Sequence, residues 1–384
     1  MLILYFFIPN FSIAEEVHCK HTVSTEELKT YHLMEDSFGK FFQFSTNELI
    51  CDYYTSGNIL SETSYKNDKI ERIVKNYFEN GIISSEVPYK YDKKDGVSRF
   101  YSENGDIREE IPFKNGKLEG FKRRFTGSKL VNESLYRDGN LEVERGYDIM
   151  TGKLLWEATR KSGEKTGARG FYANGKLSWE TLYKNGKAEV QNKYYESGKI
   201  RAKTPYKDGK EDGLSKEYYE SSSLLSETPY KNGKIEGLSK HYYESGEIAA
   251  EITFENNEKQ GIASGYHKNG KLSWKDSFKN DEVEGLSTRY YESGKRQLEI
   301  SYKNGKADGS SRVYYESGKL REESFYTDNE REGLSNIYNE NGRLWGKIFY
   351  RGGKAVSGTC GDGRPLTSAE VLNWNNGHSV ICDR

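Results

Sequence analysis

The sequence predicts an all-β fold, an elongated antiparallel β-meander of about thirteen 24-residue hairpin repeats with a short cap at each end. Three observations predict it: a repeat with a period of 24 residues, two turn signals in each period, and alternation of apolar and polar residues between the turns. The composition agrees, because the chain is rich in aromatic residues (14%) and in Gly (39) but poor in Pro (6). A chain with so few aliphatic residues favours paired strands in a thin sheet over packed layers.

The first fourteen residues form a separate segment. Residues 1–14, MLILYFFIPNFSIA, have no charged side chain, and the acidic residues Glu15 and Glu16 follow. Ser12 and Ala14 supply the small residues that signal peptidase needs before its cleavage point. The apolar run is too short to span a membrane, which takes about 20 residues. We therefore predict a signal peptide and an exported protein, located in the periplasm, at the cell surface or in the medium. A buried N-terminal strand is the alternative.

Four cysteines lie near the two ends of the chain: Cys19 and Cys51, then Cys360 and Cys382. An even number of cysteines in an exported chain indicates disulfides, and the separation between the ends favours local pairing. We predict the disulfides Cys19–Cys51 and Cys360–Cys382. They would staple an N-terminal cap and a C-terminal cap that cover the open edges of the sheet. These caps are expected at residues 15–52 and 358–384.

The repeats fill residues 53–357. Their register is set by a glycine that often follows Glu, at Gly96, Gly120, Gly213, Gly237, Gly261, Gly285, Gly309 and Gly333. We expect this glycine to leave room for an aromatic ring over the backbone.

Each repeat has two turn signals. One is Glu-Ser-Gly-Lys, as at 292–295, and the other is Lys-Asn-Gly-Lys, as at 303–306. Asn-Gly and Asp-Gly tolerate positive φ at both central positions, as a type I′ hairpin turn requires. Between the turns, Leu298, Ile300 and Tyr302 alternate with polar residues, which is strand periodicity. Each repeat is therefore predicted to be one β-hairpin.

Aromatic residues recur within the hairpins. Tyr-Tyr pairs stand at 53–54, 194–195, 218–219, 242–243, 290–291 and 314–315. Neighbouring residues on a strand point to opposite faces, so we expect an aromatic ladder on each face. Packing on the sheet is also the favoured role of the tryptophans, and stacking on a sugar ring is the alternative. The tryptophans concerned are Trp156, Trp179, Trp274 and Trp345.

A short helix is predicted in the C-terminal cap. Thr367 and Glu370 have the spacing of a capping box, and Leu366 and Val371 flank them as a hydrophobic staple. Gly377 is the expected stop. We expect this helix to fold over the last hairpin.

The repeat resembles a known family, the MORN repeat, and in particular its bacterial variant with the motif Y-Y-x-x-G-K-x6-Y-K-x-G-K-x-x-G. The motif is present at Tyr290, Tyr291, Gly294, Lys295, Tyr302, Lys303, Gly305, Lys306 and Gly309. About 300 of the 384 residues are covered. The resemblance implies a β-hairpin array, and it implies scaffold or lipid-associated roles or the antitoxin label that many bacterial members carry. The predicted export departs from the antitoxin role, because a partner of a cytoplasmic toxin should stay in the cytoplasm.

Residues typical of a reaction centre are few. His18, Cys19, His21 and His32 form one cluster without a zinc-binding motif, so a disulfide-linked cap with surface histidines is favoured over a metal site. No nucleophile motif of the G-x-S-x-G type occurs in the sequence. The 58 Lys and Arg nearly balance the 59 Asp and Glu, which disfavours nucleic acid or strong membrane binding.

These observations predict an exported, non-catalytic repeat scaffold that binds a protein or glycan at the cell envelope. The alternative is an antitoxin or immunity-type protein that neutralises a partner toxin by binding it; an adjacent toxin gene and an uncleaved N-terminus would favour this role. We expect a monomer with no cofactor, no metal and no enzymatic activity.

Overall fold

The computed structural model describes residues 20–21, 47–377 and 382. The predicted signal peptide and Cys19 lie outside the described residues, so export and the Cys19–Cys51 disulfide stay predictions. The described chain divides into two units, Met1–Gly175 and Lys176–Arg384, which are considered one at a time.

Strands make up almost all of both units. The first unit contains β1 (Lys20–His21), β2 (Asn47–Tyr53), β3 (Ile59–Lys66), β4 (Lys69–Ile70), β5 (Arg72–Tyr77), β6 (Ile83–Lys90), β7 (Lys93–Lys94), β8 (Gly96–Tyr101), β9 (Ile107–Lys114), β10 (Lys117–Leu118), β11 (Gly120–Thr126), β12 (Lys129–Arg137), β13 (Asn140–Tyr147), β14 (Leu154–Lys161) and β15 (Glu164–Phe171). The second contains β16 (Leu177–Lys184), β17 (Lys187–Tyr194), β18 (Ile200–Lys207), β19 (Lys210–Glu211), β20 (Gly213–Tyr218), β21 (Leu224–Lys231), β22 (Lys234–Ile235), β23 (Gly237–Tyr242), β24 (Ile248–Glu255), β25 (Glu258–Tyr266), β26 (Leu272–Lys279), β27 (Glu282–Val283), β28 (Gly285–Tyr290), β29 (Arg296–Lys303), β30 (Lys306–Tyr314), β31 (Leu320–Thr327), β32 (Glu330–Arg331), β33 (Gly333–Tyr338), β34 (Leu344–Arg351), β35 (Lys354–Cys360) and the helix α1 (Ser368–Asn375).

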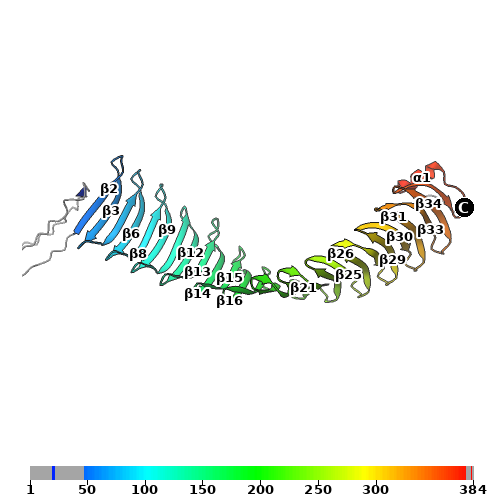
Figure 1. Cartoon of the computed structure of the whole chain (residues 1–384), viewed down its shortest axis with the longest axis horizontal. Coiled ribbons are helices and arrows are strands. Elements are labelled where there is room, and N and C mark those ends of the chain that lie inside the picture. The colour runs from blue at the N-terminus through cyan, green and yellow to red at the C-terminus, as the bar shows by residue number, and fades with distance from the viewer. Residues whose placement is uncertain (1–19, 22–46, 378–381, 383–384) are drawn as a thin grey trace, which may run out of the picture. The chain divides into compact units, whose positions relative to one another are not determined.

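Within each unit each long strand pairs with the next long strand along the chain, as Figure 1 shows. Short strands such as β4 and β19 pair with the long strand that precedes them. The pairings are antiparallel throughout the repeats, and β1 and β2 pair in parallel. The predicted all-β fold and antiparallel meander are therefore confirmed.

The Asn-Gly turns have the predicted conformation. Asn304 and Gly305 have φ values of 49° and 74°, and Asn232 and Gly233 have 52° and 82°. Positive φ at both central residues is the signature of the type I′ turn, whose twist matches that of the strands it joins.

The Glu-Ser-Gly turns are built differently. The Tyr195 N–H donates to the Lys199 carbonyl at 2.9 Å, and the Gly198 N–H donates to the Tyr195 carbonyl at 2.8 Å. Gly198 has a φ of 91°. This is a three-residue loop that closes on a left-handed glycine, and the pairing register shifts beside it.

The repeat glycines are required by the backbone conformation and not by an aromatic ring above them. All eight have φ between 69° and 119°, where side chains are disfavoured. A Cβ on Gly96 or Gly213 would lie 2.8 or 2.9 Å from a proline Cγ, whereas one on Gly285 would meet nothing within 4 Å. The expectation that these glycines make room for a ring is therefore wrong. They allow the irregularity that separates short strands such as β19 and β20.

Several Asn-Gly turns are also hydrogen-bonded to the turn of the preceding repeat. The Gly233 N–H donates to the Glu211 carbonyl at 2.8 Å, and the Asn232 N–H donates to Asp212 Oδ2 at 3.1 Å. The same bond joins the Asn304 N–H to Glu284 Oε2 at 2.8 Å. In most repeats the residue before the repeat glycine, an Asp or Glu or, at Gln260, an amide, thus ties its own repeat to the next one.

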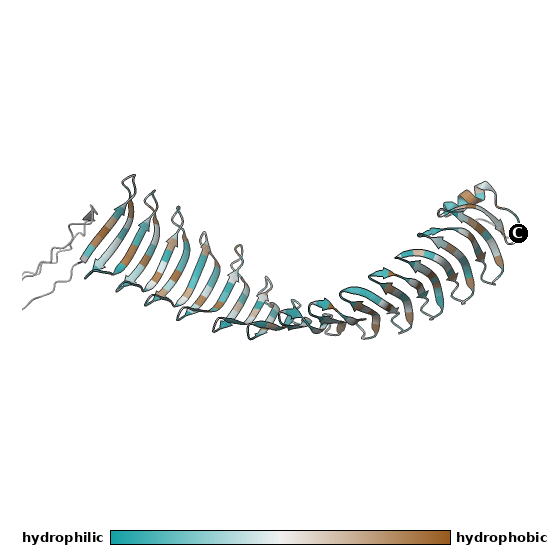
Figure 2. Ribbon diagram, viewed as in Figure 1, coloured by the Kyte–Doolittle hydropathy of each residue, from teal (hydrophilic) through white to brown (hydrophobic). Residues whose placement is uncertain are grey.

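The core is thin and made of small side chains. The most buried residues include Ser98, Ser239, Ala263, Ser324 and Ser335, each at most 2% exposed. Hydrophobic and hydrophilic residues alternate along the strands of each unit (Figure 2). Hydrogen bonding between strands therefore carries a large share of the stabilisation that aliphatic packing supplies in a layered domain.

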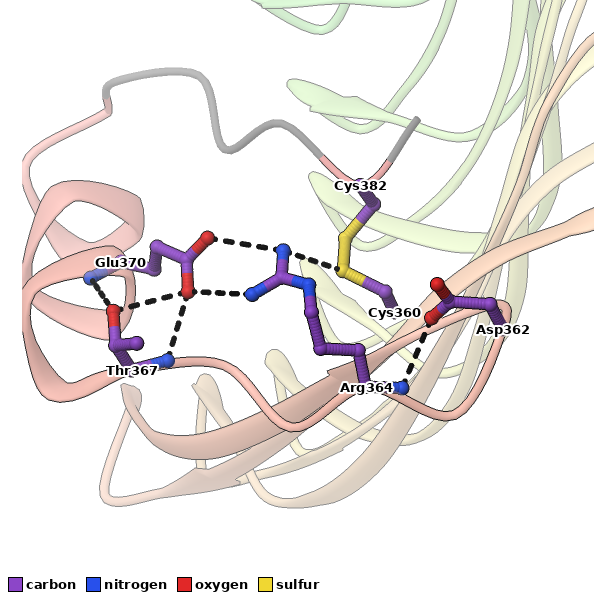
Figure 3. Close-up of a disulfide and its surroundings, with 6 residues drawn as sticks. All are labelled: Cys360, Asp362, Arg364, Thr367, Glu370 and Cys382. Carbon is purple, nitrogen blue, oxygen red and sulfur yellow. Dashed lines mark hydrogen bonds and ion pairs between the residues drawn. A yellow bond between two sulfur atoms is a disulfide. The ribbon is translucent and has the colours of Figure 1, made fainter. Parts of the chain in front are cut away.

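The C-terminal cap has the predicted construction. Thr367 Oγ1 accepts from the Glu370 N–H, and Glu370 accepts from the Thr367 N–H, which is the capping box. The disulfide Cys360–Cys382 is confirmed, and Figure 3 shows it beside Arg364, whose guanidinium pairs with Glu370.

A small apolar cluster lies under α1. Its members are Ile348, Tyr350, Ala355, Ile337, Leu366, Val371 and Trp374. The helix thus packs over the last hairpin, as expected.

Candidate interaction surface

The described residues offer no constellation for catalysis or metal binding. No group of three or more His, Cys, Asp or Glu side chains is placed to hold a metal within the described ranges. An open hollow of about 350 Å³ lies over β2, β3 and β5, and its lining includes Glu62, Arg72 and Lys75 without a His or Cys. No helix in the part of the chain that the structure describes is long and apolar enough to cross a membrane.

One face of the second unit instead exposes a row of apolar side chains, which we call the apolar row. These side chains are between 36% and 55% exposed: Leu214, Leu238, Ile262, Leu286, Phe325, Leu334 and Phe349. Most of them directly follow a repeat glycine, so they recur every 24 residues. Since the repeat contributes two strands about 4.8 Å apart, neighbouring row members stand roughly 10 Å from each other.

Small residues separate the members of the row. Leu238 pairs with Thr253, Ile262 with Ser277, and Leu286 with Ser301 across their strands. The row therefore alternates large and small side chains from strand to strand in these repeats, whereas Leu334 and Phe349, both members of the row, pair with each other. The 24-residue step is broken at Ser310, and the apolar member of that repeat is Phe325 on the paired strand.

Charged residues run beside the row on the same face. Alternate residues of a strand share a face, so Lys216 lies on the side of Leu214. Lys216 Nζ is 2.9 Å from Glu227 Oε1, and Lys240 Nζ is 3.5 Å from Glu251 Oε1. The hydrogen bond from the Lys216 ammonium lowers the pKa of Glu227, and burial raises it. The Tyr242 hydroxyl adds a second lowering hydrogen bond, so the pKa lies below its usual value. The apolar row is thus flanked by paired charges of alternating sign.

The first unit has a more tightly bonded series of charge pairs between neighbouring strands. Arg145 donates to Glu157 Oε2 at 2.7 Å and to Glu133 Oε1 at 2.9 Å, and Arg169 reaches Glu157 Oε1 at 2.6 Å. Burial raises the pKa of Glu157, but the hydrogen bonds from Arg145 and Arg169 outweigh it and leave that pKa below its usual value. Glu157 is 6% exposed, and this buried carboxylate on β14 binds the arginines of β13 and β15 on either side.

In several repeats, the tyrosine at the first position of the Tyr-Tyr pair, or at the same place where the pair is absent, as at Tyr101, bonds backwards along the chain. Tyr101 donates to Glu86 Oε2 at 2.7 Å, and Tyr314 donates to Glu299 Oε2 at 2.7 Å, each partner being 15 residues earlier. Burial first, and then the Glu86 carboxylate, raise the pKa of Tyr101 to about 12. These carboxylates are occupied by structural bonds and do not form an acid–base pair.

The second tyrosine bonds forwards. Tyr291, which was predicted as a repeat-defining residue, donates to the Tyr314 carbonyl at 2.7 Å, 23 residues later. The same bond joins Tyr195 to the Tyr218 carbonyl and Tyr219 to the Tyr242 carbonyl. The pair therefore links a repeat to both of its neighbours by hydrogen bonds.

The remaining repeat-defining tyrosines lie in strands. Tyr290 pairs with Arg296 and Tyr302 with Gly285 between β28 and β29. They are part of the sheet and do not converge on a common site.

The tryptophans serve packing. The indole of Trp156 covers Gly146 and that of Trp274 covers Gly265 so closely that neither glycine has space for a Cβ. Trp345 stacks on Trp374 of α1 with ring centroids 5.8 Å apart. These rings thus pack on glycines or on another ring, while Trp156 stays 37% exposed.

Sequence reasoning missed the apolar row. Its signal was present in the recurring Gly-Leu or Gly-Ile step at positions such as 237–238 and 285–286. Alternation alone could not reveal it, because a sheet of one layer shows the same alternation whichever face is covered.

Comparison with known proteins supports the repeat character. A family model described as the MORN repeat variant matches residues 51–67, 73–91, 94–115, 190–208, 211–232, 235–256, 283–304 and 307–328. No curated protein matches the chain. Among solved structures, the TcdB2-TccC3-Cdc42 complex is 12% identical with a TM-score of 0.16, covering 87% of this chain and 23% of that one.

A second solved structure, a Tc holotoxin pore of Photorhabdus luminescens, is 11% identical with a TM-score of 0.15, again covering 87% of this chain and 23% of that one. This chain spans about a quarter of the length of either. Overlaps with such low scores carry no argument about function.

Proposed function

Because this chain belongs to the MORN repeat variant family, we propose that it is an exported, non-catalytic scaffold that binds a protein partner at the cell envelope. The apolar row of the second unit is the observation that supports this role. The row exposes an apolar side chain in successive repeats on one face, and extended apolar surface of this kind marks interaction sites.

The chemistry of the row favours a protein over a glycan. Its members are aliphatic side chains and phenylalanines, and the paired charges beside them form a polar border. An apolar centre with a polar rim is the usual anatomy of a protein–protein interface.

Export is the second part of the proposal. It rests on the charge-free segment 1–14 and on the disulfide Cys360–Cys382, because disulfides persist in oxidising compartments. Fractionation of cells that make the protein should place it outside the cytoplasm, with a mature N-terminus at Glu15. Recovery in the cytoplasm with residues 1–14 attached would contradict this part.

The binding role is tested by variants of the row. The mature chain is immobilised and exposed to envelope extract, and the retained protein is identified, purified and measured for direct binding. A variant with Leu238→Ser, Ile262→Ser and Leu286→Ser should lose at least ~10-fold in affinity, about 1.4 kcal/mol.

A matched control carries Lys184→Ser, Lys207→Ser and Lys231→Ser at the exposed ends of β16, β18 and β21 in the same unit. It should bind like the unchanged chain. Equal binding by the row variant and the control would refute the role of the row, and retention of a purified envelope polysaccharide in place of a protein would refute the partner class.

A further inference from the structure

The helix α1 occupies the outer edge of β35, the last strand of the described sheet. The Ala355 N–H donates to Asn375 Oδ1 at 2.8 Å, and Asn375 Nδ2 donates to the Ala355 carbonyl at 2.9 Å. Further along the edge, the Leu366 N–H donates to the Gly358 carbonyl at 2.8 Å. Backbone groups that would pair with another strand are thus engaged by the cap.

The bonds at Ala355 reproduce those of an ordinary repeat. Ala307 occupies the same place two repeats earlier, since Ala307 pairs with Tyr302 as Ala355 pairs with Tyr350. The Ala307 N–H donates to Asn329 Oδ1 at 2.7 Å, and the Asn329 N–H donates to the Ala307 carbonyl at 2.9 Å. Asn329, in the next turn, is therefore hydrogen-bonded to both the N–H and the carbonyl of Ala307.

This exchange recurs in other repeats. It joins Ile70 to Asp92, Ile235 to Asn257, and Lys259 to Asp281. The side-chain amide of Asn375 thus supplies, from a helix, what the turn of a following repeat supplies elsewhere.

The chain leading to α1 also begins as a repeat. The Cys360 N–H donates to the Arg364 carbonyl at 2.8 Å and the Gly363 N–H to the Cys360 carbonyl at 2.9 Å. These are the two bonds of the three-residue loop between Tyr315 and Lys319. Pro365 then forms a single bridge with Thr359, and the chain turns into the helix in place of a strand.

We propose that the outer edge of β35 is a site for adding an antiparallel strand of the same repeat type, and that α1 blocks this site by imitating the next repeat. The occupant is a strand of another MORN-type repeat that ends in a turn with Asn or Asp at its second position. This choice follows from the bonds at Ala355, which an Asn or Asp at that position makes in the repeats. Strand addition of this kind obtains its affinity from main-chain hydrogen bonds.

The block depends on the disulfide. The helix has eight residues, none of them buried, and Leu372 is 60% exposed. Helices of this length are marginal without tertiary support. The bond Cys360–Cys382 ties the segment after α1 to β35. A dithiol reductant would transfer two electrons and two protons, becoming a disulfide itself and leaving Cys360 and Cys382 as thiols, and the helix would then leave the edge.

A labelled peptide tests the proposal. The probe has the sequence of residues 320–331, which forms the strand and turn beside β30, and its binding to the full chain is followed by fluorescence anisotropy. The chain is examined oxidised, reduced with dithiothreitol, as Cys382→Ser and as Asn375→Ala. Asn373→Ala, on the same helix, is the control, and a scrambled peptide checks the register.

The peptide should bind the reduced chain and Cys382→Ser at least ~10-fold more tightly than the oxidised chain or Asn373→Ala. Asn375→Ala, with its disulfide intact, should show an intermediate affinity. Equal binding in all forms would show that α1 blocks nothing, and binding in none of them would show that the edge accepts no strand.

If Cys382→Ser fails to fold, Asn375→Ala and the reduced unchanged chain still decide the outcome. Hydrogen exchange at the Ala355 amide should accelerate in both. An unchanged exchange rate at Ala355 on reduction would refute release of the helix.

Discussion

At the scale of single residues, the tyrosine pairs act as connectors between repeats. Tyr219 donates to the Tyr242 carbonyl at 2.8 Å, and Tyr242 donates to Glu227 Oε2 at 3.0 Å. The expected aromatic ladder is thus joined by hydrogen bonds that reach neighbouring repeats. A hydroxyl bonded to a carboxylate contributes more than a neutral pair, because one partner is charged.

These bonds predict a loss of stability in alkali. The pKa values of Tyr101 and Tyr147 are raised to about 12, by burial first and then by Glu86 and Glu133 respectively. Since the folded value exceeds the unfolded value of 10, the contribution is complete below pH 10 and is lost as the pH rises towards 12. Tyr101→Phe should lower the free energy of unfolding by about 1 kcal/mol at pH 7 and flatten its decline between pH 10 and 12.

Tyr91, which is 63% exposed, supplies the control in the same unit. Urea titrations at pH 7 and pH 11 should find Tyr91→Phe unchanged at both. An equal effect of the two substitutions would show that the Tyr101–Glu86 bond is not responsible.

At the scale of elements, the second residue of a hairpin turn determines whether the turn makes a side-chain hydrogen bond to the preceding repeat. Where this residue is Asn or Asp, as at Asn257 and Asn329, its side chain accepts a backbone N–H from the preceding repeat. This bond explains why non-glycine residues are kept at φ values of 76° and 72°. Where the residue is Gly305, the N–H still donates to the Val283 carbonyl at 3.1 Å, but no side chain is present to accept.

The comparison predicts opposite effects of two substitutions. Gly305→Asn should add a bond from the Val283 N–H and stabilise the chain by about 0.5 kcal/mol, since Asn tolerates positive φ. Gly305→Ala takes the same strained φ of 74° without the bond and should destabilise by about 1 kcal/mol. Urea midpoints distinguish them, and equal midpoints would mean that the side-chain bond has no role.

The sequence was informative for those features that local chemistry determines. Asn-Gly at 304–305 specifies its turn through φ, and Thr367 with Glu370 specifies the start of α1 through two reciprocal bonds. The disulfide of the C-terminal cap followed from cysteine spacing. Contacts between repeats were not predictable in this way. The bond from Tyr291 to the Tyr314 carbonyl depends on how one hairpin lies against the next, although its period of 24 residues was visible.

At the scale of the whole molecule, stability is a sum of links between neighbours. Bonds between repeats join residues about one repeat apart, such as Tyr315 with the Tyr338 carbonyl and Trp374 Nε1 with the Tyr350 hydroxyl. Repeat proteins of this type respond to damage near the point where it is made.

Removal of the C-terminal disulfide should therefore have a local effect. The bond joins residues 22 apart and should contribute roughly 2–4 kcal/mol. Hydrogen exchange of Cys382→Ser should show lost protection in α1 and along the outer edge of β35, and full protection in β20 and β23. Uniform loss across the second unit would instead indicate one cooperative block.

The interruption of the apolar row at Ser310 has a consequence for where a partner can sit. A row with a constant step of 24 residues offers a periodic partner several equivalent positions, each displaced by one repeat, and the partner could slide among them without a preferred stop. Ser310, with the exposed Phe325 on the paired strand, breaks that equivalence, because a displaced partner would meet a hydroxyl and a ring where it otherwise meets an aliphatic and a small side chain. A partner that matches this irregularity can therefore bind in only one register along an otherwise repetitive surface.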